Sequence, residues 1–203
     1  MAKILGIEVD KILIYPLGGI SKFKSILNIS PKEEFLILMM GPLFQFLAYF
    51  LLLFIFPKDA ILIKNYHYGI LLFNLLPIYP LDGGKLVNIL LSINLSFKNS
   101  LSLTIIISYI IVGLMIIISY PNIYLNLIIM ILFLIYKIIK EQKQINFTYQ
   151  KFILERYLYK YKFKNSIIIN NPNKFHRNKR HLLKLDNKYY LESEYLEKKY
   201  KKG

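Results

Sequence analysis

The stretch FLILMMGPLFQFLAYFLLLFIFP, Phe35–Pro57, decides the fold class, because its 23 residues include no charged side chain. As a helix it would reach about 35 Å, enough to cross a hydrocarbon core of ~30 Å. A second uncharged run, of 38 residues, extends from Asn99 to Tyr136. A buried helix of a soluble domain rarely needs so long an uncharged run. We therefore predict an all-α polytopic membrane protein.

Four membrane-spanning segments are predicted around these runs: Phe35–Phe56, Tyr66–Leu81, Leu101–Tyr120 and Asn122–Ile139. The second is shorter and is interrupted by Pro77 and Pro80. Pro121 and Asn122 are predicted to form the turn between the last two spans, since proline seldom occupies a helix interior and asparagine favours turns. The chain then has three regions: a segment 1–34 on the cytoplasmic side, a transmembrane core 35–139 and a basic cytoplasmic tail 140–203.

Before the first span, the sequence predicts a short β-hairpin and then a helix start. Ile12–Tyr15 and Ile20–Phe23 contain β-branched and aromatic residues on either side of a Pro-Leu-Gly-Gly break. This pattern is typical of two short strands joined by a turn. In SPKEEF, Ser30 is the predicted N-cap, with proline at the first helical position and two glutamates in the first turn.

The distribution of Lys and Arg predicts the orientation in the membrane. Residues 140–203 contain 17 Lys and Arg against 6 Asp and Glu, a net +11 of the chain's +15. Because cytoplasmic segments carry the excess of Lys and Arg, we expect a multi-pass protein of the cell membrane with a cytoplasmic C-terminus. The tail is expected to attract anionic lipid, at about 1 kcal/mol per cation near the surface. Its alternation of aromatic and basic residues also suits nucleic acid, but no nucleic-acid partner is expected.

The stretch NLLPIYPLDGGK, Asn74–Lys85, places a single acid, Asp82, at the end of an apolar segment. Asp-Gly is common turn chemistry, so a plain turn is one interpretation. A functional site is the other, since an ionisable residue in a membrane segment is costly. A helix broken at membrane depth is tolerated only beside protein or a water-filled cavity, and a carboxylate aimed into such a cavity can bind a metal ion or a proton. The residues that shape the break are Asn74, Pro77, Pro80, Gly83 and Gly84.

At these residues the chain resembles the site-2 protease family, the intramembrane zinc metalloproteases, most closely the branch containing the sporulation-factor-processing protease. The resemblance implies that Asp82 is the third zinc ligand and that Asn74 lies close to the catalytic centre. Three further stretches are similar to the family: LGIEVDKILIYPLGG, PKEEFLILMMGPLFQF with Gly41-Pro42, and FILERYLYKYKFKN. Zinc as cofactor and a transmembrane protein as substrate are implied, and a regulatory membrane partner is compatible with the resemblance.

The family's His-Glu-x-x-His helix, which supplies two zinc ligands and the general base, has no counterpart in these 203 residues. A catalytic zinc takes three protein ligands and keeps one position for water. We therefore assign no catalytic residue in this chain, and Asp82 alone cannot make a hydrolytic site. His67, His176 and His181 lack the required spacing and are interpreted as surface or interface residues. The resemblance places Ala2 about four positions after the family's second histidine, so we expect a longer protein with two more spans upstream.

The leading hypothesis is a membrane-embedded zinc endopeptidase that cleaves transmembrane substrates. The Ile12–Phe23 hairpin could dock an unwound substrate strand by edge pairing, and the Asn74 amide could bond the substrate or a developing oxyanion. One alternative is a non-catalytic pseudoprotease that binds partner helices. Another is an ion- or proton-coupled transporter with Asp82 as its site, although no inverted repeat is visible in the sequence.

Overall fold

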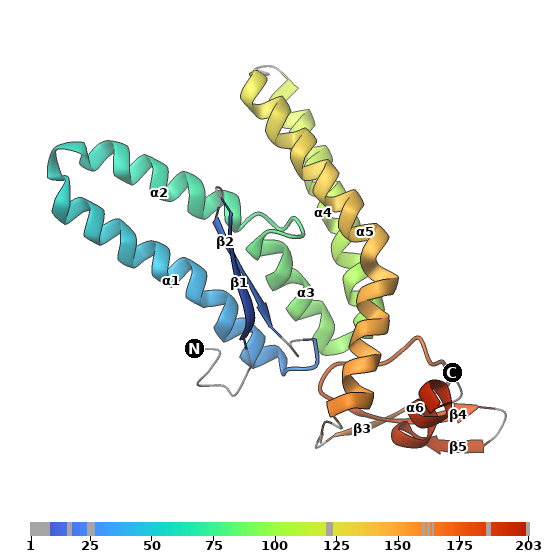
Figure 1. The fold of residues 1–203 in the computed structure, drawn as a ribbon. Helices are drawn as coiled ribbons and strands as arrows, with labels where there is room; N and C mark the ends of the chain where they lie inside the picture. The colour runs from blue at the N-terminus through green and yellow to red at the C-terminus, as the bar shows by residue number, and fades with distance from the viewer. Residues whose placement is uncertain are drawn as a thin grey trace. The chain divides into compact units, whose positions relative to one another are not determined.

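The structure is a computed structural model that describes residues 9–15, 18–23, 27–120, 124–159, 161, 163, 165–185 and 188–201, with side chains from residue 27 onward. Its elements, in chain order, are β1 (Val9–Tyr15), β2 (Gly18–Phe23), α1 (Pro31–Ile55), η1 (Pro57–Asp59), α2 (Ala60–Asn74), α3 (Asp82–Asn94), α4 (Phe97–Ser119), α5 (Leu125–Tyr159), β3 (Ser166–Ile169), β4 (Arg180–Leu185), β5 (Lys188–Leu191) and α6 (Glu192–Lys201) (Figure 1).

These elements divide into two compact units. The helical unit comprises Phe35–Leu91 and Leu101–Gln144. The polar unit comprises Met1–Glu34, Ser92–Ser100 and Ile145–Gly203. Four of the helices, α1, α3, α4 and α5, therefore begin in one unit and end in the other.

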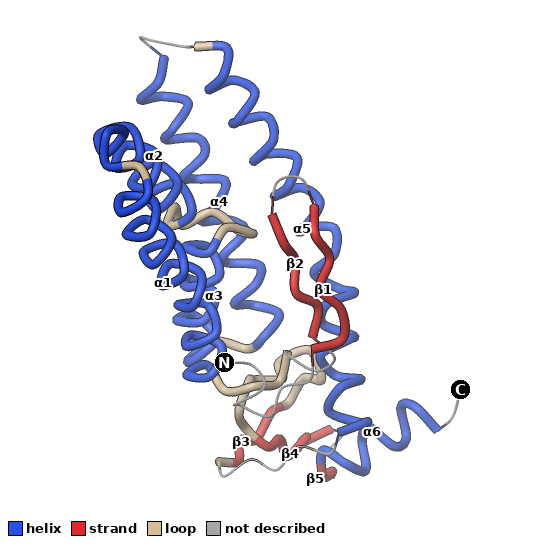
Figure 2. The backbone as a smooth tube through the Cα atoms, turned by 60° about the vertical axis from the view of Figure 1, so that its left-hand side comes forward, coloured by secondary structure: helices blue, strands red, loops and turns tan. Residues whose placement is uncertain are grey.

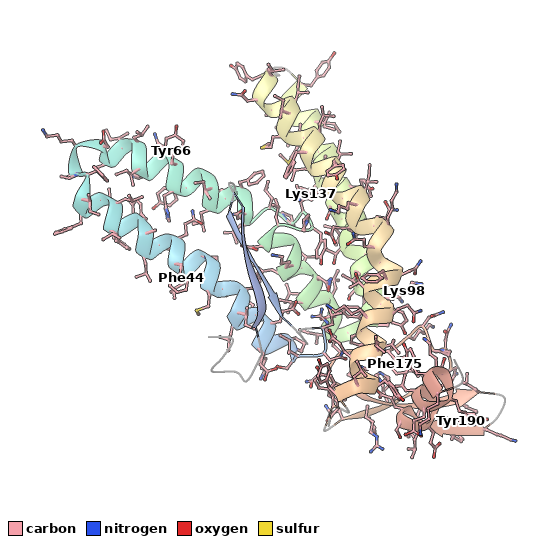
Figure 3. The ribbon with its side chains drawn as sticks, in the orientation of Figure 1. Phe44, Tyr66, Lys98, Lys137, Phe175 and Tyr190 are labelled. Atoms are coloured by element: carbon pink, nitrogen blue, oxygen red, sulfur yellow. The ribbon has the colours of Figure 1, made fainter. Side chains whose placement is uncertain are left out.

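In the helical unit, α1 and α2 form an antiparallel hairpin joined by η1 (Figure 1). Phe44 and Tyr66 point away from this hairpin (Figure 3), and both side chains are exposed. Although α1 is rich in Phe and Leu, none of its 25 residues is buried. In the described part of the chain, α1 and α4 are the two helices long and apolar enough to cross a membrane. Apolar surface of this extent is what lipid, rather than water, would cover.

Two of the predicted spans differ from the helices in their boundaries. α2 ends at Asn74 rather than at Leu81, and Pro77 and Pro80 lie in the loop that follows, because proline lacks the backbone donor that a helix needs. The 15 residues of α2 reach only about 22 Å. α5 continues to Tyr159, 20 residues past the predicted end of the fourth span. The predicted turn at 121–122 lies outside the described residues.

The start of the polar unit confirms two predictions. β1 and β2 pair antiparallel, with Leu13 opposite Ile20, as the predicted hairpin requires. At the start of α1, the backbone N–H of Glu33 donates to Ser30 Oγ (3.3 Å) and the N–H of Ser30 donates to Glu33 Oε2 (2.9 Å). This reciprocal pair is a capping box, so Ser30 is the N-cap.

The C-terminal region contains a sheet that an all-α prediction with a basic tail misses. β3 pairs parallel with β4, and β4 pairs antiparallel with β5. The three strands are drawn in red in Figure 2. Leu183 of β4 and Leu196 of α6 are buried, together with Phe152 of α5. These apolar side chains give the polar unit a core of its own, so residues after 140 are more than a basic tail.

Candidate functional site

The predicted motif folds as a helix end, a loop and a helix start. Asn74 is the last residue of α2, and Asp82 is the first residue of α3. Between them, Ile78 is fully buried. The backbone N–H of Tyr79 donates to Ser108 Oγ of α4 at 2.8 Å. The loop is thus fastened to α4 just before Asp82, which restricts where the carboxylate can lie.

The paired glycines let this loop approach the first turn of α3. A Cβ on Gly83 would fall well inside van der Waals contact with the carbonyl groups of Leu75 and Leu76. A Cβ on Gly84 would overlap the backbone of Ile78 in the same way. The glycines are therefore required by close packing of two backbone segments.

The Asp82 carboxylate lies at the N-terminus of α3, where the helix dipole favours negative charge. Its side chain is 28% exposed, and Oδ1 accepts a hydrogen bond from Lys85 Nζ at 3.0 Å. Oδ2 faces α1: a Cβ placed on Gly41 would lie 3.5 Å from it. One carboxylate oxygen is thus bound by Lys85, and the other faces the space that the glycine leaves beside α1.

Taken alone, these residues do not fit a zinc site. No group of three His, Cys, Asp or Glu side chains that could hold a metal occurs within the described ranges. Asp82 offers a suitable oxygen donor, but a lysine ammonium already bonds its other oxygen. A zinc bound here would need at least two further ligands. Asp82 is therefore a single candidate ligand among the described residues.

The interpretation of the histidines as surface or interface residues is wrong for His67 and His181. His67 is buried in the α1–α2 hairpin, where its ring stacks on Tyr49 with centroids 4.3 Å apart, and Gln45 Nε2 donates to its backbone carbonyl at 2.9 Å. His181 is fully buried in the polar unit. Aromatic rings surround His67, whereas His181 lies between the Phe175 ring and the ionised Glu192. Sequence spacing does not show such neighbours.

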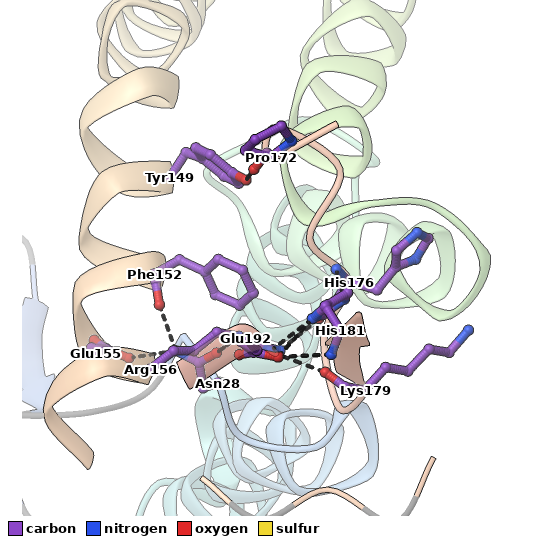
Figure 4. A network of polar contacts seen from close by, with 10 residues as sticks. All are labelled: Asn28, Tyr149, Phe152, Glu155, Arg156, Pro172, His176, Lys179, His181 and Glu192. Carbon is purple, nitrogen blue, oxygen red and sulfur yellow. Dashed lines mark hydrogen bonds and ion pairs between the residues drawn. The ribbon is translucent and has the colours of Figure 1, made fainter. Parts of the chain in front are cut away.

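A second polar site, which the sequence did not reveal, surrounds Arg156 of α5 (Figure 4). Its Nε donates to Asn28 Oδ1 at 2.7 Å, and its Nη1 donates to Glu192 Oε1 at 2.8 Å. Nη1 and Nη2 also donate to the backbone carbonyls of Lys179 and His176. One guanidinium therefore joins the segment before α1 to the sheet and to α6. The nearest signal in the sequence is the adjacent Glu-Arg pair inside the apolar stretch FILERYLY.

Hydrogen bonds assign the tautomer of His181 in this network. Nε2 accepts from the backbone N–H of His176 (2.9 Å), so Nδ1 carries the proton and donates to Glu192 Oε2 (3.0 Å). Burial lowers the pKa of His181, and the Arg156 charge acts in the same direction. Burial acts to raise the pKa of Glu192, but the His181 hydrogen bond and the Arg156 charge outweigh it and lower that pKa. His181 is consequently neutral and Glu192 ionised near neutral pH.

A neighbouring carboxylate completes the network. Glu155 Oε2 accepts from the backbone N–H of Leu27 and from Asn28 Nδ2. Burial raises the pKa of Glu155, and the Asn28 hydrogen bond opposes the shift. Beside Arg156 lies a cavity of about 390 Å³. Its lining mixes Arg180 with Glu192 and Glu197, so its charge does not select one class of ligand.

Comparison with known proteins gives the class of this chain. No protein-family model matches it. It is 31% identical to stage IV sporulation protein FB of Bacillus subtilis over 159 residues, which cover 74% of this chain and 55% of that protein. It is 35% identical to zinc metalloprotease MJ0392 of Methanocaldococcus jannaschii over 102 residues, which cover 45% of this chain and 29% of that protein.

These relatives confirm the resemblance on which the sequence prediction rested. Its homologues, a sporulation protein and a zinc metalloprotease, are consistent with the site-2 protease family of intramembrane metalloproteases and with its sporulation-factor-processing branch. It spans about half the length of the first relative and less than a third of the second.

Proposed function

We propose that this chain carries the third-ligand part of a membrane-embedded zinc metalloprotease of the site-2 type. The observation that carries the proposal is the geometry of Asp82. One oxygen is held by Lys85, and the other faces the side of α1 where Gly41 leaves space. The relative named zinc metalloprotease MJ0392 supports the same interpretation and favours proteolysis over ion transport.

The remaining ligands and the general base must then come from residues outside this chain. A His-Glu-x-x-His helix is absent from the 203 residues. The second candidate function is a membrane pseudoprotease that binds partner helices without cleaving them. The reading frame upstream of Met1 distinguishes the two, because the proteolytic form requires codons for that helix.

The substrate of the proteolytic form would be a transmembrane protein whose helix unwinds into an extended strand. β1 and β2 form a two-stranded sheet, so each strand has one edge that is not paired within that sheet. An extended peptide can add to such an edge by backbone hydrogen bonds. Asn74, at the end of α2, would supply an amide for the substrate or for a developing oxyanion.

We further propose a four-span arrangement with all three segments of the polar unit on the cytoplasmic face. One folded unit cannot be divided between two sides of a membrane, so its segments must share a side. Together they hold 21 Lys and Arg against 9 Asp and Glu, a net +12 of the chain's +15. The positive-inside rule places such a unit in the cytoplasm. Its charge would also attract anionic lipid headgroups.

Zinc content tests the proposed function. We expect about one zinc per chain in an upstream-extended form that contains the His-Glu-x-x-His helix, and loss of most of it in Asp82→Asn. Asp59→Asn is the matched control, since Asp59 is the other acid of Phe35–Leu91 and lies at the η1 turn. Elemental analysis measures the metal, and cleavage of a membrane-inserted substrate is followed in parallel. Full zinc retention in Asp82→Asn would contradict the proposal.

A further inference from the structure

Arg177 joins two parts of the chain that lie far apart in sequence. Its side chain is only 5% exposed, and its Nη1 forms an ion pair with Glu34 Oε2 in the first turns of α1, 143 residues away. Its guanidinium also lies over the Phe97 ring, 4.9 Å from the ring centroid. Arg177 therefore contacts the start of α1 and the start of α4 at once.

The Phe97 side of this junction is firmly held. The Phe97 N–H donates to the backbone carbonyl of Phe175 at 2.8 Å. Its ring stacks on Phe152 of α5, with centroids 4.2 Å apart and planes at 9°. Phe97 follows α3 by three residues, so the same contacts restrain the end of α3.

Arg177 restrains α1 directly through Glu34 and the end of α3 indirectly through Phe97, and α1 and α3 are the helices that meet at Asp82. Glu34 and Gly41 are seven residues apart on α1, which is about two helical turns, so they lie on the same helix face. Gly41 faces the Asp82 carboxylate, and Asp82 begins the helix that ends at Asn94, beside Phe97. A helix is stiff over this length, so a contact at one end constrains the other.

We propose that Arg177 is a positioning residue for the Asp82 site. Its ion pair with Glu34 sets the rotation and axial position of α1, so that a glycine rather than a bulkier side chain faces the carboxylate. A buried guanidinium without an anionic partner is costly. The arrangement in which Arg177 pairs with Glu34 is therefore strongly preferred over one in which the two are apart. The importance of Asp82 rests on the proposed function, whereas the positioning itself does not depend on catalysis.

The absence of cysteine from the chain allows a direct test by disulfide cross-linking. A Cβ at position 41 lies 3.5 Å from Asp82 Oδ2, so the two side chains face each other, and the pair Gly41→Cys and Asp82→Cys should form a disulfide when membranes are treated with an oxidant. Because disulfide formation is steeply dependent on geometry, we expect Arg177→Gln to slow this reaction by about tenfold. Arg177→Lys, which keeps the charge, should give an intermediate rate.

A second cysteine pair separates positioning from unfolding. The pair Tyr49→Cys and His67→Cys reports on the α1–α2 hairpin, because the rings of these two residues stack there. The rate at which this pair forms a disulfide should be unchanged by Arg177→Gln. Lys201→Gln removes the exposed ion pair with Glu197 and should affect neither pair. The proposal is overturned if Arg177→Gln leaves the 41–82 rate unchanged, if it slows both pairs equally, or if the parent 41–82 pair fails to form. Zinc retention in Asp82→Asn would overturn the proposed function and leave this result standing.

Discussion

Gly83 and Gly84 hold the motif loop against the first turn of α3, because backbone atoms occupy the space where a side chain would begin. We expect Gly83→Ala to destabilise the protein by about 3 kcal/mol, since backbone cannot move aside as a flexible side chain can. A Cβ added to Gly113 of α4 would meet nothing within 4 Å. Gly113→Ala should therefore be neutral or stabilising by up to about 1 kcal/mol.

Thermal unfolding in detergent measures both glycine variants. A melting temperature of Gly83→Ala equal to that of the unchanged protein would show that the loop can move away from α3. The comparison is matched, because the same methyl group is added in both variants and only its surroundings differ.

At the scale of elements, β4 and α6 are joined by the hydrogen bond between His181 and Glu192. Burial lowers the pKa of His181 below its ordinary 6.5, and burial likewise lowers that of His176. Both histidines bind protons more readily in the unfolded chain. The free energy of unfolding should therefore be highest above about pH 6.5. It should fall as the pH drops below that value, by up to about 1.4 kcal/mol per pH unit for each histidine.

Hydrogen exchange of the β4 amides at pH 7.5 and pH 5.5, corrected for the intrinsic rate, measures this loss. His181→Asn cannot titrate in this range, so its protection should depend less steeply on pH, although its stability is lower throughout. Equal or greater protection of β4 in the unchanged protein at pH 5.5 would contradict the assigned neutral tautomer.

At the scale of the whole molecule, the polar unit gathers residues from both ends and the middle of the chain. Together with the proposed four spans, this grouping of three segments predicts which positions lie on the same side of the membrane. Single cysteines at Lys32, Asn99 and Asn170, all exposed, should react with a membrane-impermeant thiol reagent from the cytoplasmic face. A cysteine at Lys58, in the η1 turn, should react from the opposite face.

The unchanged protein, which has no cysteine, gives the background of this labelling experiment. Labelling of Asn99→Cys and Asn170→Cys from opposite sides would be incompatible with a single folded polar unit. Labelling of Lys58→Cys from the cytoplasmic face would instead contradict the four-span path while leaving the polar unit intact.

The features that were predictable from sequence depend on neighbours along the chain. The uncharged run Phe35–Pro57 predicts a helix long and apolar enough to cross a membrane, and a helix of that length needs no other segment to define it. The capping box at Ser30 and the β1–β2 hairpin are likewise set by residues within a few positions of each other. The same locality made Asp82 a candidate ligand, since its motif occupies one short stretch.

Only the tertiary structure decided what these local elements touch. The contacts of Arg156 with Asn28 and of Arg177 with Glu34 join residues 128 and 143 positions apart, and no periodicity in the sequence encodes such pairings. They make the basic C-terminal region a folded unit and enclose His181 within it. Hydrophobicity and local hydrogen bonding are properties of short segments, whereas burial of a charge depends on which distant partner neutralises it. That partner is known only once the chain has folded.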